Sequence, residues 1–147
     1  MRDALIVSTA RTPLTKSYRG TFNNTTAPTM AGWAIEEAVK RSGVDPEKVD
    51  DVIMGAALQQ GTQHCNVARN SALAAGLPVT VSGMTLDRQC SSGMMAIATA
   101  AKQIISDGMD VAVGGGLDSI SLVQTEKMNL DRWVDKKLIA KHQHIYM

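Results

Sequence analysis

The apolar positions of this chain fall into two kinds of pattern. Short continuous apolar runs alternate with longer stretches in which apolar residues recur every three or four positions. A short continuous run is typical of a strand buried on both faces, and the longer spacing is typical of an amphipathic helix. The runs predict strands at residues 4–7, 52–54, 79–86 and 111–113, and the spaced stretches predict helices over residues 29–42, 66–75 and 91–107. The order βαβαβαβ predicts an α/β fold with a mostly parallel sheet covered by helices.

The third predicted helix, residues 91–107, changes character along its length. Its first turns, around Met94 to Ala98, are apolar on every side, whereas polar residues gather on one face further along, from Thr99 to Ser106. We therefore expect the start of this helix to be deeply buried and its end to reach water.

Cys90 lies at the junction between the third predicted strand and this helix. The first N–H groups of a helix have no intrahelical partner and carry partial positive charge, so a thiolate at this point is stabilised. The thiolate is the reactive form of cysteine, which makes Cys90 a candidate nucleophile. Cys65 falls in a polar loop where we expect no such field. The alternative is that Cys90 is a structural cysteine that packs as a small hydrophobe.

The segment around Cys90 resembles the nucleophile segment of the thiolase family. That segment reads approximately Val-Asn-Arg-x-Cys-x-Ser-Gly, and residues 86–93 match it at Arg88, Cys90, Ser92 and Gly93. Three further family elements follow the same order as in thiolases: residues 10–13 before a loop that contains Gly20, residues 66–69 leading to 75–78, and residues 115–121. The resemblance covers almost the whole chain, and we expect the layered α/β fold of a thiolase half-domain.

Three positions depart from the family pattern. Asp87 stands where thiolases usually have Asn, Asp118 stands where they have Glu, and His64-Cys65 stands where they have small or amide residues. None of these departures removes the nucleophile. They leave the length of the acyl chain and the direction of the reaction open.

The resemblance also implies a domain division and a reaction. Residues 1–121 would form the N-terminal thiolase domain without its last strand, and residues 122–147 would begin an inserted loop domain.

Cys90 would attack an acyl-CoA thioester and hold the acyl group during acetoacetyl-CoA synthesis or 3-ketoacyl-CoA thiolysis. Coenzyme A would be a substrate, so no cofactor is implied. Thiolases dimerise, which implies a homo-oligomer. The other catalytic residues of the family would lie past Met147, so we expect little turnover from these 147 residues alone.

Two other interpretations of the chain stay open. It could be a relative of the β-ketoacyl-ACP synthases, which share the layered fold and a cysteine at a helix start, or a truncated remnant without catalytic activity. A dinucleotide site at Gly114 to Gly116 is not favoured, because Ser119 occupies the place of the third glycine in Gly-x-Gly-x-x-Gly.

Composition narrows the partners and the compartment. A net charge of +1 and an aromatic content of 3% supply neither the positive charge nor the stacking side chains that nucleic-acid binding needs, so we do not expect a nucleic-acid partner. No segment approaches the roughly 20 apolar residues of a membrane span, and no signal-peptide pattern opens the chain. Two cysteines make no disulfide framework, so we expect the cytoplasm. The histidines His64, His142 and His144 lack zinc-ligand spacing, and we expect no metal.

Overall fold

The computed structural model describes residues 2–142 and 144, and its centre is a parallel sheet of three strands in the order β2-β1-β3. The main elements in chain order are α1 (Ala27–Ser42), β1 (Asp51–Gly55), α2 (Val67–Ala74), β2 (Ser82–Leu86), α3 (Ser92–Lys102) and β3 (Ala112–Gly116). The short elements are η1 (Pro46–Lys48), η2 (Gly61–Gln63), the π-helical turn η3 (Gln103–Asp107), α4 (Ile120–Val123) and α5 (Lys136–Lys141).

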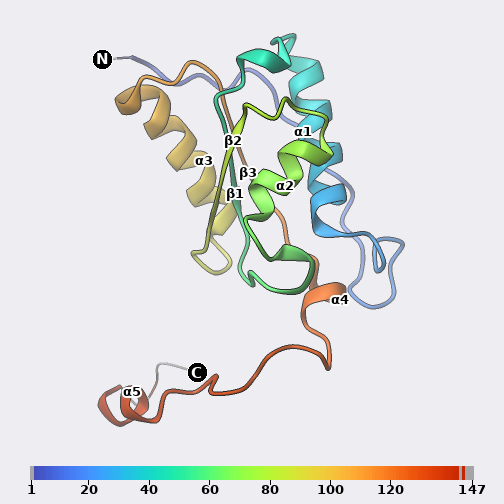
Figure 1. The fold of residues 1–147 in the computed structure, drawn as a ribbon, viewed down its shortest axis with the longest axis vertical. Helices are drawn as coiled ribbons and strands as arrows, with labels where there is room; N and C mark the ends of the chain where they lie inside the picture. The colour runs from blue at the N-terminus through green and yellow to red at the C-terminus, as the bar shows by residue number, and fades with distance from the viewer. Residues whose placement is uncertain (1, 143, 145–147) are drawn as a thin grey trace.

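The helices cover both faces of the sheet, with α1 and α2 on one side and α3 on the other (Figure 1). Every residue of β1 is buried, because β1 lies between the two other strands and between the two helical layers. Alternate side chains of a strand point to opposite faces. Val52 and Met54 accordingly join the large core cluster with α1 and α2, whereas Ile53 packs with Ala96 and Ala100 of α3. The predicted α/β class with a parallel sheet is confirmed.

Helix α1 begins at Ala27, two residues before the predicted start. Pro28 lies in the first turn, where a helix tolerates proline because the N–H groups there have no intrahelical partner. The N–H of Ala27 donates to Thr62 Oγ1 at 2.9 Å. Near the other end, the hydrogen bond from Arg41 lowers the pKa of Glu37, and the charge of Arg41 adds to this effect.

Helix α3 approaches the sheet backbone to backbone, and glycines make this possible. A Cβ atom added to Gly55 would lie 2.1 Å from the carbonyl carbon of Ser92. One added to Gly116 would lie 2.7 Å from the Cα atom of Gly93, and one added to Gly114 would lie 2.8 Å from the Cα atom of Ile97. The glycine run that ends β3 therefore serves helix packing.

The prediction that the start of α3 is deeply buried is wrong. Ser92, Ala96 and Ala100 are buried against the sheet, but Met94 is 72% exposed and Ile97 is 47% exposed. In the described part of the chain, α3 is the only long helix on its face of the sheet. Its outward side therefore stays in solvent even though it is apolar.

The predicted strand at residues 4–7 is also wrong. This segment is not a strand, and Leu5, Ile6 and Val7 are between 69% and 78% exposed. Arg2 donates to the carbonyl of Gly108, and the carbonyl of Thr9 accepts from Arg41 at the end of α1. The segment thus crosses the amino-terminal edge of the sheet and pairs with neither of the edge strands β2 and β3.

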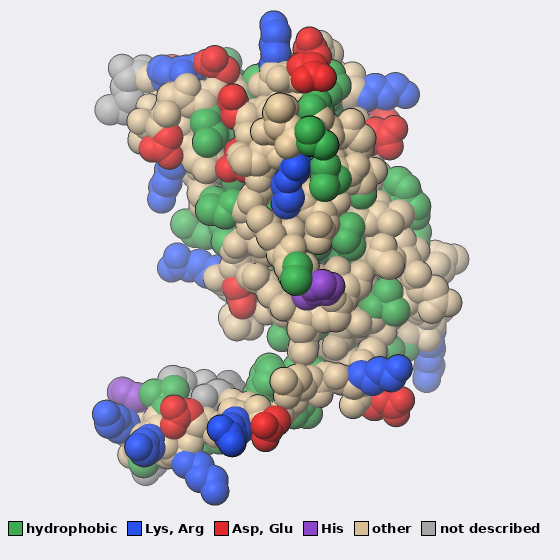
Figure 2. Space-filling model, viewed as in Figure 1, with side chains coloured by type: hydrophobic (Ala, Val, Ile, Leu, Met, Phe, Trp, Pro, Cys, Tyr) green, Lys and Arg blue, Asp and Glu red, His purple; other side chains and the backbone are tan. Residues whose placement is uncertain are grey.

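After α4, the chain leaves the body and leads to α5, which lies apart from the sheet (Figure 1). Charged side chains of both signs cover this segment on the face that Figure 2 shows. The division into units 1–121 and 122–147 stays a prediction, and residues 143 and 145–147 lie outside the described residues. No helix within the described ranges is long and apolar enough to cross a membrane.

Candidate active site

The loops that follow the three strands meet at one edge of the sheet, because parallel strands all end there. Residues 57–66 follow β1, residues 87–91 follow β2, and residues 117–121 follow β3. Cys90 lies in the second of these loops, two residues before the first residue of α3, and its side chain is exposed. Topology therefore places Cys90 at the carboxyl-terminal edge of the sheet, where α/β folds commonly bind their ligands.

The turn that carries Cys90 is held by hydrogen bonds from its own side chains. Asp87 Oδ1 accepts from the N–H of Gln89 at 2.7 Å. The buried Ser92 Oγ accepts from the N–H of Arg88 at 2.7 Å and donates to the carbonyl of Gln89 at 2.6 Å. Gln89 has a φ of 52°, a conformation that costs free energy in a residue with a side chain. This tight turn presents Cys90 to solvent at the helix start.

The amino terminus of α3 has no side-chain cap among the described residues. Ser92 is engaged with the preceding turn, as described above. The N–H of Ser92 donates to the carbonyl of Gln89 at 3.0 Å, but those of Gly93 and Met94 have no partner in the described structure, and with the helix dipole they favour negative charge at this point. The site can therefore stabilise an anion next to Cys90, either a thiolate or a developing oxyanion.

Cys65 lies in the turn that leads into α2, in a place similar to that of Cys90 before α3. It is exposed and lies two residues before Val67, the first residue of α2. This helix start, however, is capped. Asn66 Oδ1 accepts from the N–H of Arg69 at 3.3 Å, and Thr85 Oγ1 accepts from the N–H of Ala68 at 3.0 Å. The N–H groups of Ala68 and Arg69, in the first turn after Cys65, are thus already used.

Asp118 and Gln63 are two polar side chains near this edge whose hydrogen bonds became evident only from the structure. Asp118 Oδ1 accepts from the N–H of Ala57 and from Gln63 Nε2, each at 3.2 Å. The sequence indicated Asp118 only as a departure from the thiolase pattern, and it gave no signal for Gln63. A single Gln in a polar loop predicts exposure, whereas Gln63 is 1% exposed.

The histidines are not assembled into a site. His64 is exposed and caps η2, and His142 follows α5, far along the chain from Cys90. Within the part of the chain that the structure describes, no group of three or more His, Cys, Asp and Glu residues could hold a metal ion.

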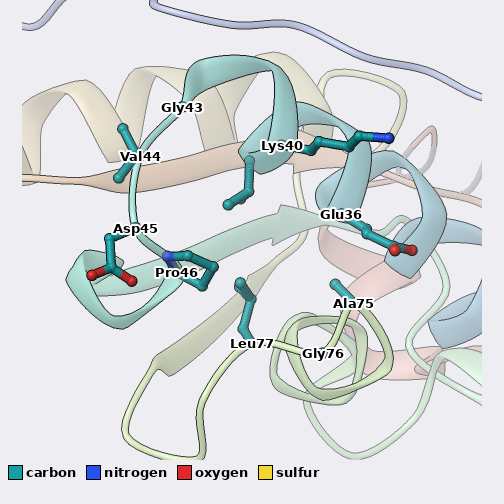
Figure 3. Close-up of a pocket in the computed structure, with 10 residues that line it drawn as sticks. Glu36, Lys40, Gly43, Val44, Asp45, Pro46, Ala75, Gly76 and Leu77 are labelled. Atoms are coloured by element: carbon teal, nitrogen blue, oxygen red, sulfur yellow. The ribbon is translucent and has the colours of Figure 1, made fainter.

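A shallow groove of about 380 Å³ lies at the opposite edge of the sheet (Figure 3). The groove is formed by Gly43 just after the end of α1, by the start of η1 at Pro46, and by the segment that leads from α2 through Gly76 to Leu77. These segments precede β1 and β2, whereas Cys90 follows β2, so the groove is separate from the candidate site.

Comparisons with known proteins concern the family and the fold of this chain. The family model "Thiolase, N-terminal domain" matches residues 4–145. The chain is 40% identical over 123 residues to a 3-ketoacyl-CoA thiolase of Bacillus subtilis (strain 168), which covers 84% of this chain and 32% of that protein. It is 36% identical over 119 residues to the peroxisomal 3-ketoacyl-CoA thiolase 2 of Arabidopsis thaliana, covering 81% of this chain and 26% of that protein.

A solved structure extends the likeness to the fold. The crystal structure of the Bacillus anthracis acetyl-CoA acetyltransferase matches 92% of this chain and 34% of that chain, with a TM-score of 0.81 and 41% sequence identity. The chain thus spans about a third of the length of the relatives it matches. The match over residues 4–145 shows that this chain belongs to the thiolase family, whose N-terminal domain it corresponds to.

Proposed function

We propose that this chain supplies the nucleophilic half of a thiolase-type acyl transfer, with Cys90 as the residue that is acylated. The observation that carries the proposal is the exposed Cys90 at the uncapped start of α3, seated against the ends of β1 and β3 through Gly55 and Gly116. The names of the relatives, 3-ketoacyl-CoA thiolase and acetyl-CoA acetyltransferase, support acyl-CoA thioesters as the substrate class.

The first half-reaction needs only a thiolate and a site for an oxyanion. The Cys90 sulfur adds to the carbonyl carbon of the thioester, and the carbonyl electron pair moves to oxygen. When the carbonyl re-forms, the bond to the sulfur of coenzyme A breaks, and coenzyme A leaves as a thiolate that takes up a proton. The backbone N–H of Cys90 is the oxyanion donor that we assign in this chain.

The second half-reaction requires groups that we do not assign to these residues. A second acetyl-CoA loses its α proton and the resulting carbanion attacks the acyl-Cys90, or coenzyme A cleaves a 3-ketoacyl-CoA in reverse. Both directions need a further acid and base. Groups that act as a unit lose nearly all their effect when one is absent. We therefore expect slow acylation of Cys90 by the 147-residue chain, but no carbon–carbon bond formation.

Acylation is tested by incubating the chain with acetyl-CoA and locating the acetyl group by peptide mass spectrometry. We expect it on Cys90, and we expect Cys90→Ser to abolish the thioester adduct while Cys65→Ser retains it. An acetyl thioester on Cys65, or none on either cysteine, would contradict the proposal. The second outcome would favour a remnant without catalytic activity.

We also propose that the protein self-associates. β2 and β3 each pair only with β1 in the described sheet, and the outward face of α3 exposes Met94 and Ile97. Open strand edges and apolar faces are stabilised when another chain covers them. Light scattering at tens of micromolar should show a dimer or larger species. A monomer by light scattering that is still folded by circular dichroism at the same concentration would contradict this proposal.

The cytoplasm stays our prediction for the compartment. Both cysteines are free, which fits a reducing environment. The relatives include a bacterial thiolase and a plant thiolase named as peroxisomal, so a fluorescent fusion of the natural protein is the decisive measurement.

A further inference from the structure

Gln63 is a fully buried polar side chain that joins two loops at the edge of the sheet where Cys90 lies. It is 1% exposed and belongs to η2, in the loop after β1. Its Nε2 atom donates to the carbonyl of Leu58 at 2.9 Å and to Asp118 Oδ1 at 3.2 Å. Its Oε1 atom accepts from the N–H of Ser119. Three hydrogen bonds thus converge on one side chain, and two of the partners lie in the loop after β3.

Asp118 extends this connection by replacing a backbone acceptor. Beyond the ends of the strands, the N–H of Leu117 still donates to the carbonyl of Gly55 at 3.0 Å. Asp118, the residue after Leu117, then accepts through its carboxylate from the N–H of Ala57 at 3.2 Å. The pairing between β1 and β3 is therefore continued by a side chain, and Gln63 holds that side chain in place.

The same strand ends form the seat of α3. The N–H of Ala56 donates to the carbonyl of Leu86 at 3.0 Å, at the point where the chain turns toward Cys90. Gly55 contacts the backbone of Ser92, and Gly116 contacts the backbone of Gly93. A shift of the residues after Gly55 or Gly116 would thus also displace the first turn of α3.

We propose that Gln63 is a positioning residue for the site at Cys90. It fixes residues 117–121 against residues 57–63, so that the two loops flanking the start of α3 form a rigid wall for an incoming acyl-CoA. The inference rests on the proposed function of Cys90, because the wall matters only if a thioester must be held there. Positional errors of about 1 Å can lower a rate by roughly a hundredfold, so a loosened wall should be measurable.

Three variants in a Cys65→Ser background test this role. Gln63→Leu keeps the volume and removes every hydrogen bond. Gln63→Glu places a second carboxylate against Asp118, and the double variant Gln63→Glu/Asp118→Asn reverses the polar pair, so that the introduced amide would donate to the introduced carboxylate. Ser71→Ala is the matched control, since Ser71 is equally buried but bonds only the carbonyl of Val67 within α2.

Three rates are measured on each variant: acetylation of Cys90 by acetyl-CoA, its alkylation by iodoacetamide, and hydrogen exchange of the peptide that contains residues 117–121. We expect Gln63→Leu and Gln63→Glu to lower acetylation by about tenfold or more and to speed exchange, with alkylation changed less than about twofold. The double variant should recover part of the acetylation rate, because the amide–carboxylate contact is restored while the hydrogen bond to the carbonyl of Leu58 stays lost, and Ser71→Ala should retain the full rate.

The outcomes separate this inference from the proposed function. Acetylation of Gln63→Leu at the wild-type rate overturns the inference and leaves the function of Cys90 intact. If the wild-type chain is alkylated but never acetylated, the proposed function is wrong, and hydrogen exchange alone tests the role of Gln63. Exchange of residues 117–121 that is faster in Gln63→Glu and slower again in the double variant supports the role of Gln63 in fixing this loop. Exchange that is unchanged in Gln63→Glu overturns that role. If Gln63→Leu fails to fold, Gln63→Glu and the double variant carry the same comparison.

Discussion

The starts of α2 and α3 resemble one another, yet they differ in what they offer to chemistry. Each helix begins two residues after an exposed cysteine, and each follows the carboxyl-terminal edge of the sheet. At α2, Asn66 and Thr85 take up the N–H groups of the first turn, and Asn66 Nδ2 also donates to the carbonyl of Gly83 at 2.7 Å. At α3, no side chain caps the helix in the described structure.

The two helix starts are also held against the sheet in partly different ways. Both helices approach the sheet closely through glycines, since a Cβ atom on Gly83 of β2 would lie 2.6 Å from the backbone of Arg69 in α2, as one on Gly55 would meet Ser92 in α3. Only α2 is also attached to β2 by side-chain hydrogen bonds. The side chains that hold α2 also take up the N–H groups of Ala68 and Arg69. At α3 the N–H of Ser92 donates to the carbonyl of Gln89 at 3.0 Å, but no group in the described structure takes up the N–H groups of Gly93 and Met94, and an anionic intermediate needs such donors.

The largest expected effect comes from removing the glycine seat of α3. In Gly55→Ala, the new Cβ would meet the backbone of Ser92 at 2.1 Å, and backbone cannot yield as a flexible side chain can. We expect a loss of about 4 kcal/mol or more in the free energy of unfolding, measured by urea denaturation.

Gly93→Ala is the matched control for that experiment. Its Cβ would lie 3.4 Å from the Cα atom of Gly116, an ordinary contact, and alanine favours the helix by up to about 1 kcal/mol. Equal stability losses in Gly55→Ala and Gly93→Ala would show that close backbone approach is not what holds α3.

A smaller loss is expected from opening the start of α2. Asn66→Ala removes the cap and the hydrogen bonds to Thr85 and Gly83, and it places alanine at a φ of 56°. These effects together should cost about 2–3 kcal/mol of the free energy of unfolding. Asn66→Asp keeps the acceptor and loses only the donor to Gly83, so it should cost about 1 kcal/mol. A cost for Asn66→Asp as large as that for Asn66→Ala would argue against the capping role.

The smallest effect concerns the reactivity of the two cysteines. Because no side chain takes up the N–H groups of Gly93 and Met94, they can stabilise negative charge that develops on the sulfur, and we expect limiting iodoacetamide to label Cys90 roughly two- to fivefold faster than Cys65. Asn66→Gly, which removes the cap but suits the positive φ, should bring the two labelling rates closer together. Peptide mass spectrometry gives the ratio, and faster labelling of Cys65 in the wild-type chain would refute the assignment of Cys90.

Much of the fold was accessible to sequence reasoning because its signals are local. The short apolar runs predicted β1, β2 and β3 to within a few residues at each end, and the periodic stretches predicted α1, α2 and α3. The predicted strand at residues 4–7 failed because an apolar run does not specify which strand it would pair with, and in the described sheet this segment pairs with neither edge strand.

Sequence by itself determined the α/β class, the thiolase family and the position of Cys90 between a strand and a helix, since these depend on residue type and spacing. Only the tertiary structure decided which helix start is capped, which apolar side chains of α3 stay exposed, and that Gln63 is buried between two loops. Each of these depends on residues far apart in the chain, as with Gln63 and Asp118. A linear pattern records what a side chain can do, whereas its partners are set by how the strands are ordered in the sheet.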